Sequence, residues 1–229
     1  RWVDLGVRGI TSNPTIFQKA IESSDAYDDQ LRACLAERRD VESSYWDLVV
    51  ADIRDALAVM RPLHDASDGL DGWVSIEIDP RLARDPDATL AAARGLHDLI
   101  DEPNLYVKVP GTAEGLPAIR QLIGEGRSIN VTLLFSVQRY GEVIDAYLDG
   151  LEAFDATGGD LSTVSSVASF FVSRVDTETD RRLEALGSPE AIGLRGRAAV
   201  ANAKMAYALF RERFAGPRWE ALAAKGARI

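Results

Sequence analysis

Near the middle of the chain stands the stretch Asn104-Leu105-Tyr106-Val107-Lys108-Val109-Pro110-Gly111-Thr112. Apolar residues occupy every second position from Leu105 to Val109, which is the two-residue period of a β-strand, and Lys108 points to the other side. The turn signal Pro110-Gly111 follows at once. Lys108 is therefore expected near the carboxyl end of its strand, where α/β folds assemble their functional sites.

Lysine is rare in this chain. Of the 26 Lys and Arg residues only four are lysines, namely Lys19, Lys108, Lys204 and Lys225. Arginine keeps its proton in proteins, whereas a desolvated lysine can become a neutral amine that attacks a carbonyl and forms a Schiff base. Lys108 is thus a candidate nucleophile. The alternative is a gatekeeper lysine that protects an edge strand from aggregation.

Length and composition set the class of protein. With 229 residues, of which 46% are hydrophobic, the chain can bury one large core, and a single α/β domain over residues 1–229 is expected. The net charge of -10 argues against a nucleic-acid partner, because phosphates require a basic face. No apolar run is long enough for a membrane span, and no signal peptide is visible.

Cysteine and histidine usage bears on compartment and cofactors. The single Cys34 cannot form an internal disulfide, so a reducing cytoplasm is the expected location. His64 and His97 have no second His or Cys at the spacing of metal ligands. We therefore expect no metal.

Hydrophobic periodicity and turn signals predict strands that alternate with helices. The expected strands are 7–11, 73–78, 105–109, 129–135 and 163–172, and residues 227–229 resemble the start of another. The expected helices are 14–23, 25–38, 42–60, 87–100, 112–124, 137–154, 177–186, 189–214 and 218–224, with Pro62 ending the third. Such alternation indicates βα units and a parallel sheet.

Three of the predicted strands carry a polar face, formed by Glu77, Lys108, Asn130 and Thr132. Buried parallel strands are normally apolar on both faces. A closed (β/α)8 barrel of the TIM type explains the polar face, because inward residues of its strands converge at the carboxyl ends to form the active site. A doubly wound sheet explains it less well, and no glycine-rich nucleotide-binding motif is present.

A lysine nucleophile needs a group that moves protons while the carbinolamine forms and loses water. Glu77 is the candidate for this role, and a structural ion pair with Lys108 is the alternative. Thr132 and Asn130 could orient a water or substrate hydroxyls, or could be hydrogen-bonded core residues.

Polar residues also lie at the ends of two further strands. Asn13 precedes Pro14 at a helix start, which is the position of an N-cap, but its place at a strand end keeps it a candidate for binding. Ser169 and Arg174 lie at or just past another strand end, where a hydroxyl and a guanidinium fork suit a phosphate ester. Arg174 could instead pair with Asp176 at the surface.

Five motifs, in order and spanning residues 7–176, resemble the transaldolase family. They are Thr11-Ser12-Asn13-Pro14-Thr15-Ile16-Phe17, Ser75-Ile76-Glu77-Ile78-Asp79, the Lys108 strand, Asn130-Val131-Thr132-Leu133-Leu134-Phe135-Ser136 and Ser169-Phe170-Phe171-Val172-Ser173-Arg174. The first motif further resembles the bacterial branch whose members are sometimes fused to glucose-6-phosphate isomerase. The resemblance implies a barrel of the class I aldolase kind.

The activity implied by the resemblance is the transfer of a dihydroxyacetone unit from sedoheptulose 7-phosphate to glyceraldehyde 3-phosphate, in the pentose phosphate pathway and without a cofactor. The implied roles are Schiff-base formation for Lys108, water binding for Glu77 and Thr132, binding of the three-carbon unit for Asn13 and Asn130, and phosphate binding for Ser169 and Arg174.

The chain departs from this family at both ends. Transaldolases carry an aspartate on the first barrel strand, which would precede Arg1, and Asp4 falls in the lead-in to the second strand. The chain would hold about strands 2 to 6 and the start of strand 7, so we expect a fragment of the barrel, because so few strands cannot close it.

Two other functions remain open. One is another Schiff-base aldolase, acting on fructose 6-phosphate or deoxyribose phosphate, which would share the lysine and the barrel but release a free product. The other is a non-catalytic truncated domain. The sequence does not fix the oligomeric state, and a homodimer is the assembly we consider.

Overall fold

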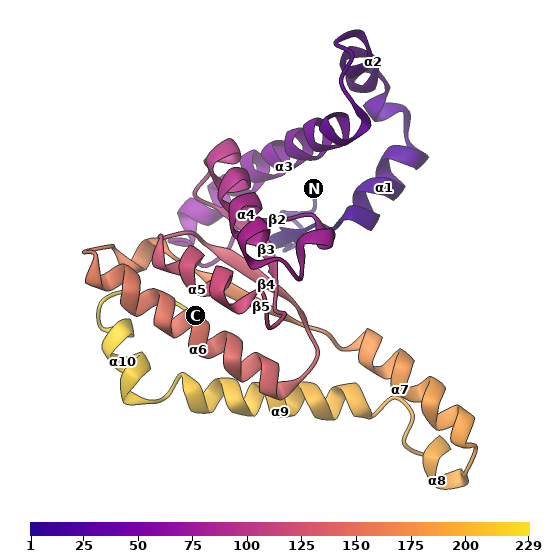
Figure 1. Cartoon of the computed structure of the whole chain (residues 1–229), viewed down its shortest axis with the longest axis vertical. Helices are drawn as coiled ribbons and strands as arrows, with labels where there is room; N and C mark the ends of the chain where they lie inside the picture. Colours follow the sequence, from indigo (N-terminus) through magenta and orange to yellow (C-terminus); the bar gives the residue numbers. More distant parts are fainter. The chain divides into compact units, whose positions relative to one another are not determined.

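The computed structural model describes all residues from Arg1 to Ile229. Its strands are β1 (Gly9–Thr11), β2 (Trp73–Glu77), β3 (Leu105–Pro110), β4 (Ile129–Leu134) and β5 (Ser166–Phe170). Its α-helices are α1 (Pro14–Ser23), α2 (Asp28–Ala36), α3 (Val41–Ala66), α4 (Pro86–Ile100), α5 (Leu116–Gly124), α6 (Val137–Ala156), α7 (Ser173–Leu186), α8 (Pro189–Ile192), α9 (Ala198–Arg213) and α10 (Pro217–Ala223). Short 3-10 helices are η1 (Asp25–Tyr27), η2 (Pro80–Leu82) and η3 (Leu161–Thr163). Strands alternate with helices through most of the chain (Figure 1), which confirms the predicted α/β class.

The chain forms two compact units. The first comprises Arg1–Ile78 and Gly95–Lys108, and the second comprises Asp79–Arg94 and Val109–Ile229. Within the first unit β1 pairs with β2 and β2 with β3, and within the second β4 pairs with β5; every one of these pairings is parallel. Parallel neighbours joined by helices are the successive βα units of a TIM-type barrel, as predicted. The single domain over residues 1–229 stays a prediction.

In the first unit the long helix α3 packs on β2. The buried residues of α3 recur at helical spacing, and Leu57 and Met60 are almost completely enclosed. Pro62 was expected to end this helix, but α3 continues through it to Ala66. Proline costs one backbone hydrogen bond. Residues before and after Pro62 are packed: Met60 is fully buried, and the His64 ring lies edge-on to the Trp73 ring with 5.0 Å between the ring centres.

In the second unit α5 and α6 lie side by side, and α9 runs along α6 (Figure 1). A Cβ atom on Gly150 of α6 would come within 2.7 Å of the Arg120 carbonyl oxygen of α5, so the glycine permits this close approach. Ion pairs fasten the C-terminal helices to α6: Arg213 binds Asp145 at 2.8 Å, and Arg218 binds Asp149 at 2.6 Å.

Further predicted elements differ from the structure. Residues 25–38 form η1 followed by α2 rather than one helix, and the predicted strand 163–172 is the shorter β5 preceded by η3. The predicted helix 189–214 is split into α8 and α9, because Gly196 between them takes a left-handed φ of 68° that no helix interior allows. Residues 227–229, predicted to begin a strand, have no regular secondary structure. No helix combines the length and the apolar composition needed to cross a membrane.

Candidate active site

The site is organised around an ion pair in the first unit. Glu77 of β2 and Lys108 of β3 are direct partners in the parallel register, so their side chains leave the sheet on the same side. The Lys108 Nζ atom donates a hydrogen bond to Glu77 Oε2 at 3.0 Å. Only 9% of the lysine side chain and 12% of the glutamate side chain are exposed, so this contact is shielded from water.

The burial of Lys108 bears on the gatekeeper interpretation. A gatekeeper lysine protects a strand by extending its charge into solvent. Every residue of β3 is buried, and Lys108 is itself 7% exposed. The gatekeeper interpretation is therefore wrong, because a buried ammonium cannot repel an approaching chain. A structural ion pair and an acid–base role for Glu77 both fit the same geometry.

Sequence reasoning missed a second partner of the lysine. The Lys108 Nζ atom also donates a hydrogen bond to the backbone carbonyl oxygen of Ser12 at 3.1 Å. Ser12 follows β1 directly and is 5% exposed. A backbone carbonyl carries no signature in the amino-acid type, and only the register of β1 on β2 brings it to the lysine.

Asn13 is the N-cap of α1, as the alternative interpretation expected. Its backbone is extended, and its Oδ1 atom accepts a hydrogen bond from the Ile16 backbone N–H at 2.9 Å. The following Pro14 occupies the first helical position. The cap uses Oδ1 and does not engage the amide Nδ2 of Asn13.

In the second unit, β4 carries Asn130 and Thr132, which are 4% and 1% exposed. The predicted alternation of β4 fails after them. Leu133 has a left-handed φ of 61° and the register with β5 shifts between Val131 and Leu134, which marks a β-bulge. The extra residue breaks the two-residue period of β4, and Leu134, which follows it, is fully buried.

Ser169 on β5 contacts Asn130 on β4. The Ser169 hydroxyl donates to Asn130 Oδ1 at 2.8 Å. Because this bond engages the amide oxygen, it orients the amide and directs Nδ2 to the opposite side.

Arg174 lies in the first turn of α7 and is exposed. Its guanidinium carbon lies 4.6 Å from the centre of the Phe171 ring, and this ring stacks on Phe135 at 5.1 Å. Asp176, the alternative partner of Arg174, accepts a hydrogen bond from the Ala199 N–H at 2.8 Å and so binds the start of α9. Stacking on an aromatic face leaves the N–H groups of an arginine free to bind an anion.

The predicted residues thus form two groups. Asn13, Glu77 and Lys108 belong to the first unit, and Asn130, Thr132, Ser169 and Arg174 belong to the second. Within the units, the structure brings Glu77 to Lys108 and Ser169 to Asn130. No group of three or more His, Cys, Asp or Glu side chains has the arrangement of a metal site.

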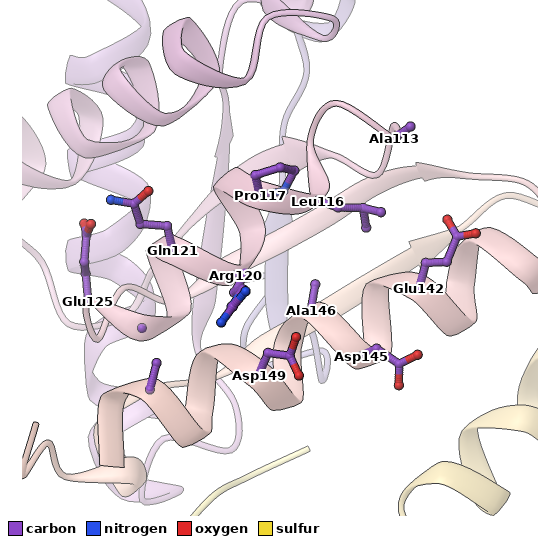
Figure 2. A pocket seen from close by; sticks show the side chains of 12 residues that line it. Ala113, Leu116, Pro117, Arg120, Gln121, Glu125, Glu142, Asp145, Ala146 and Asp149 are labelled. Carbon is purple, nitrogen blue, oxygen red and sulfur yellow. The ribbon is translucent and has the colours of Figure 1, made fainter. Parts of the chain in front are cut away.

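A separate surface groove of about 920 Å³ lies in the second unit between α5 and α6 (Figure 2). Its lining includes the apolar side chains of Leu116 and Ala146. It also includes the charged side chains of Arg120 on α5 and Asp149 on α6. None of the predicted site residues lines this groove. In an α/β barrel the helices cover the outer face of the strands, so a groove between helices is not where strand-end chemistry takes place.

Comparison with known proteins decides the family. A family model described as transaldolase/fructose-6-phosphate aldolase matches residues 1–227. The chain belongs to this family. The transaldolase resemblance carried by the five motifs is thereby confirmed.

Individual members of the transaldolase family agree with this assignment. The chain is 58% identical over 225 residues to a transaldolase from Acidothermus cellulolyticus, an alignment that covers 98% of this chain and 60% of the relative. It is 55% identical over 222 residues to a transaldolase from Thermobifida fusca, with 97% and 60% covered. Transaldolase 1 from Streptomyces coelicolor is 54% identical over 217 residues, with 95% and 57% covered. The chain thus spans about 60% of the length of these relatives.

Proposed function

We propose that this protein catalyses the transaldolase reaction, in which a dihydroxyacetone unit moves from a ketose phosphate to an aldose phosphate through a Schiff base on Lys108. The observation that carries the proposal is the buried contact of Lys108 Nζ with Glu77 Oε2 in a chain of this family. The sugar phosphates in question are sedoheptulose 7-phosphate as donor and glyceraldehyde 3-phosphate as acceptor.

The first half of the reaction forms the imine. Neutral Lys108 Nζ attacks the C2 carbonyl of the ketose, and the oxygen takes up a proton to give a carbinolamine. Loss of that hydroxyl as water leaves a protonated imine between Nζ and C2. Glu77 is within hydrogen-bond reach of Nζ, so its carboxylate can accept the lysine proton and return one to the leaving hydroxyl. Thr132 is proposed to hold the water that is released.

The second half breaks and remakes a carbon–carbon bond. When the aspartate that the transaldolase resemblance places on the first barrel strand removes the proton of the C4 hydroxyl, the C3–C4 electron pair moves into the protonated imine, and an aldose phosphate leaves. The resulting enamine of the three-carbon unit attacks the aldehyde carbon of the acceptor and regenerates an imine. Water then hydrolyses this imine and releases the new ketose phosphate. The imine nitrogen accepts the electron pair, so no free carbanion forms.

The remaining site residues are proposed to bind substrate. Asn13 and Asn130 suit the hydroxyls of the three-carbon unit, because each amide oxygen accepts a hydrogen bond that fixes the amide, from the Ile16 N–H and from the Ser169 hydroxyl respectively. Ser169 and Arg174 suit the phosphate, since an arginine fork and a hydroxyl are strong phosphate donors. No cofactor enters any step of the proposed reaction.

The wider setting follows from the same proposal. We place the protein in the cytoplasm and in the pentose phosphate pathway, with a homodimer as the proposed assembly. From the form of the Thr11–Phe17 motif we also propose that it belongs to the bacterial branch that is sometimes fused to glucose-6-phosphate isomerase.

A second function is favoured by one observation, because the description of the matching family also names fructose-6-phosphate aldolase. That activity would use the same imine, but the enamine would take up a proton at carbon and water would hydrolyse the resulting imine to free dihydroxyacetone. Product analysis separates the two. With fructose 6-phosphate as donor, a transaldolase releases little free dihydroxyacetone and transfers the three-carbon unit to an added acceptor aldehyde to form a new ketose. The aldolase releases free dihydroxyacetone in the absence of an acceptor.

The proposal is tested by borohydride trapping with fructose 6-phosphate, followed by peptide mapping of the chain. Borohydride reduces the imine to a stable secondary amine, so a three-carbon adduct is expected on Lys108 and on none of Lys19, Lys204 and Lys225. Lys108→Arg keeps the charge but cannot lose its proton and should give no adduct. Lys204→Ala removes an exposed lysine and serves as the matched control. An adduct on another lysine, or none at all, would refute the proposal.

A further inference from the structure

We propose that Ser12 is a positioning residue for Lys108: its backbone carbonyl, held in place by its own side chain, fixes the direction of the lysine lone pair. This inference rests on the proposed Schiff-base function of Lys108. Its physical basis is a chain of three hydrogen bonds that links β1, β2 and β3 in the first unit.

The first part of the argument concerns Ser12 itself. Both of its donors bind one acceptor on β2: the Ser12 N–H lies 3.2 Å and the Ser12 Oγ 2.8 Å from the Ser75 carbonyl oxygen. Ser12 is 5% exposed and Ser75 is 3% exposed, so water does not compete for these bonds. Two bonds to one atom restrict the rotation of the Ser12 residue and therefore the direction of its carbonyl.

The second part concerns where that carbonyl points. The first turn of α1 uses the carbonyl of Asn13, which accepts from the Ile16 N–H at 3.0 Å and the Phe17 N–H at 3.3 Å. The Ser12 carbonyl lies one residue earlier and accepts instead from Lys108 Nζ at 3.1 Å. The end of β1 and the start of α1 therefore present an acceptor to the lysine.

The third part is the geometry at the nitrogen. A neutral amine has two N–H donors and one lone pair in a tetrahedral arrangement. When the two N–H groups bind Glu77 Oε2 and the Ser12 carbonyl, the lone pair must point in the one remaining direction. Ser12 supplies this restraint without a second negative charge, which would stabilise the ammonium and oppose the loss of its proton. An aligned lone pair is the condition for attack on a carbonyl carbon.

The proposal is tested with Ser12→Ala, which removes the hydroxyl anchor and leaves the carbonyl free to rotate. The rate of borohydride trapping at Lys108 with fructose 6-phosphate is expected to fall about tenfold, as is kcat, while KM changes by less than about twofold. Ser12→Thr keeps the hydroxyl and should restore most of the trapping rate.

Ser128→Ala is the matched control. Ser128 is 7% exposed, and its hydroxyl accepts a hydrogen bond from the Ser165 N–H at 3.1 Å, so the control loses a comparable buried bond outside the site. Thermal unfolding of both variants shows whether they are similarly destabilised. The positioning role would be overturned if Lys108 of Ser12→Ala were trapped at the wild-type rate. It would also be overturned if Ser128→Ala slowed the trapping as much as Ser12→Ala does.

A backbone variant addresses the carbonyl directly. Replacement of Asn13 by its α-hydroxy acid turns the Ser12–Asn13 amide into an ester, whose carbonyl is a weaker acceptor, while every side chain is retained. Slower trapping is expected here even if Ser12→Ala does not fold, and an unchanged rate would refute the proposal. Absence of any adduct in the unsubstituted chain would instead refute the Schiff-base function, so the two failures are distinguishable.

Discussion

Glu77 and Lys108 are direct register partners on β2 and β3, and the carboxylate oxygen and the ammonium nitrogen lie 3.0 Å apart with about a tenth of each side chain exposed. Such a pair has two possible purposes. A buried ion pair contributes to the uniqueness of a fold, and a carboxylate beside a lysine moves protons. The structural role and the acid–base role predict different effects on stability and on kcat when the carboxylate is replaced by an amide.

Glu77→Gln keeps an acceptor oxygen for Lys108 but removes the proton-accepting carboxylate. If Glu77 is the acid–base group, kcat should fall by roughly a hundredfold or more with little change in KM. Steady-state kinetics with a ketose phosphate and an aldose acceptor measure this. Glu125→Gln, which removes an ion pair with Arg94 outside the site, is the control. A variant that loses stability yet keeps its kcat would identify a purely structural pair.

Thr132 offers a hydroxyl that is 1% exposed on β4. Thr132→Val preserves the shape of the side chain and removes the hydroxyl, so the proposed water would lose a ligand and kcat should fall by about tenfold. Thr89→Val is a matched control, because Thr89 is also 1% exposed and its hydroxyl binds the Leu82 carbonyl at 2.8 Å. Comparable kcat values for the two variants would argue against a role for Thr132.

Arg174 is expected to bind the phosphate of the substrate. Arg174→Ala should raise the KM for an aldose phosphate by roughly 10- to 100-fold, because a pair of charge-assisted hydrogen bonds is lost. Stability should change little, since the side chain is exposed. Arg182→Ala on the same helix, whose guanidinium binds Glu178 at 2.7 Å, is the control. An unphosphorylated aldose should not distinguish wild type from Arg174→Ala, and if it does, the phosphate role is wrong.

Gly111 follows β3 and donates its N–H to the Thr132 carbonyl at 2.7 Å. A Cβ atom there would lie 2.5 Å from Leu134 Cδ2, so Gly111→Ala should lower the free energy of unfolding by about 1–3 kcal/mol through overpacking. Gly95→Ala is the contrasting variant, because nothing lies within 4 Å of its added Cβ and it sits inside α4. That change should stabilise by about 0.5–1 kcal/mol. Urea unfolding measures both, and a neutral Gly111→Ala would contradict the close packing.

Tyr27 links η1 to α3 through a hydrogen bond of 2.6 Å to Asp52 Oδ2. This bond, together with burial and the nearby negative charge, raises the pKa of Tyr27 to about 12. Because the phenol of the unfolded chain titrates near its ordinary value of 10.0, the bond stabilises the fold fully below that pH and the contribution disappears as pH rises from about 10 to about 12.

Tyr27→Phe removes this pH-dependent contribution. The free energy of unfolding should therefore decrease less between pH 8 and about 11 in the variant than in the wild type. Tyr207→Phe, at an exposed position on α9, is the control. Equal pH dependence in wild type and Tyr27→Phe would contradict the assignment.

The amino-acid sequence by itself determined the α/β class, the order of the strands along the chain and the choice of Lys108. These depend on local signals: the two-residue period of the Lys108 strand, the Pro110-Gly111 turn and the placement of Asn13 before Pro14. Local signals also predicted α1 with the bounds it has. They failed where packing decides, as at Pro62, which α3 passes through because contacts on both sides hold the helix.

Only the tertiary structure decided which groups meet. The contact of Glu77 with Lys108 depends on the register of β2 and β3, and the bond between Ser169 and Asn130 depends on the neighbouring strands β4 and β5. The bulge at Leu133 and the carbonyl of Ser12 left no trace in the residue types, because a backbone dihedral and a backbone oxygen are set by the hydrogen-bond ladder around them. The sequence could therefore single out Lys108 as the candidate nucleophile, whereas the partners of its Nζ atom are set by the folded sheet.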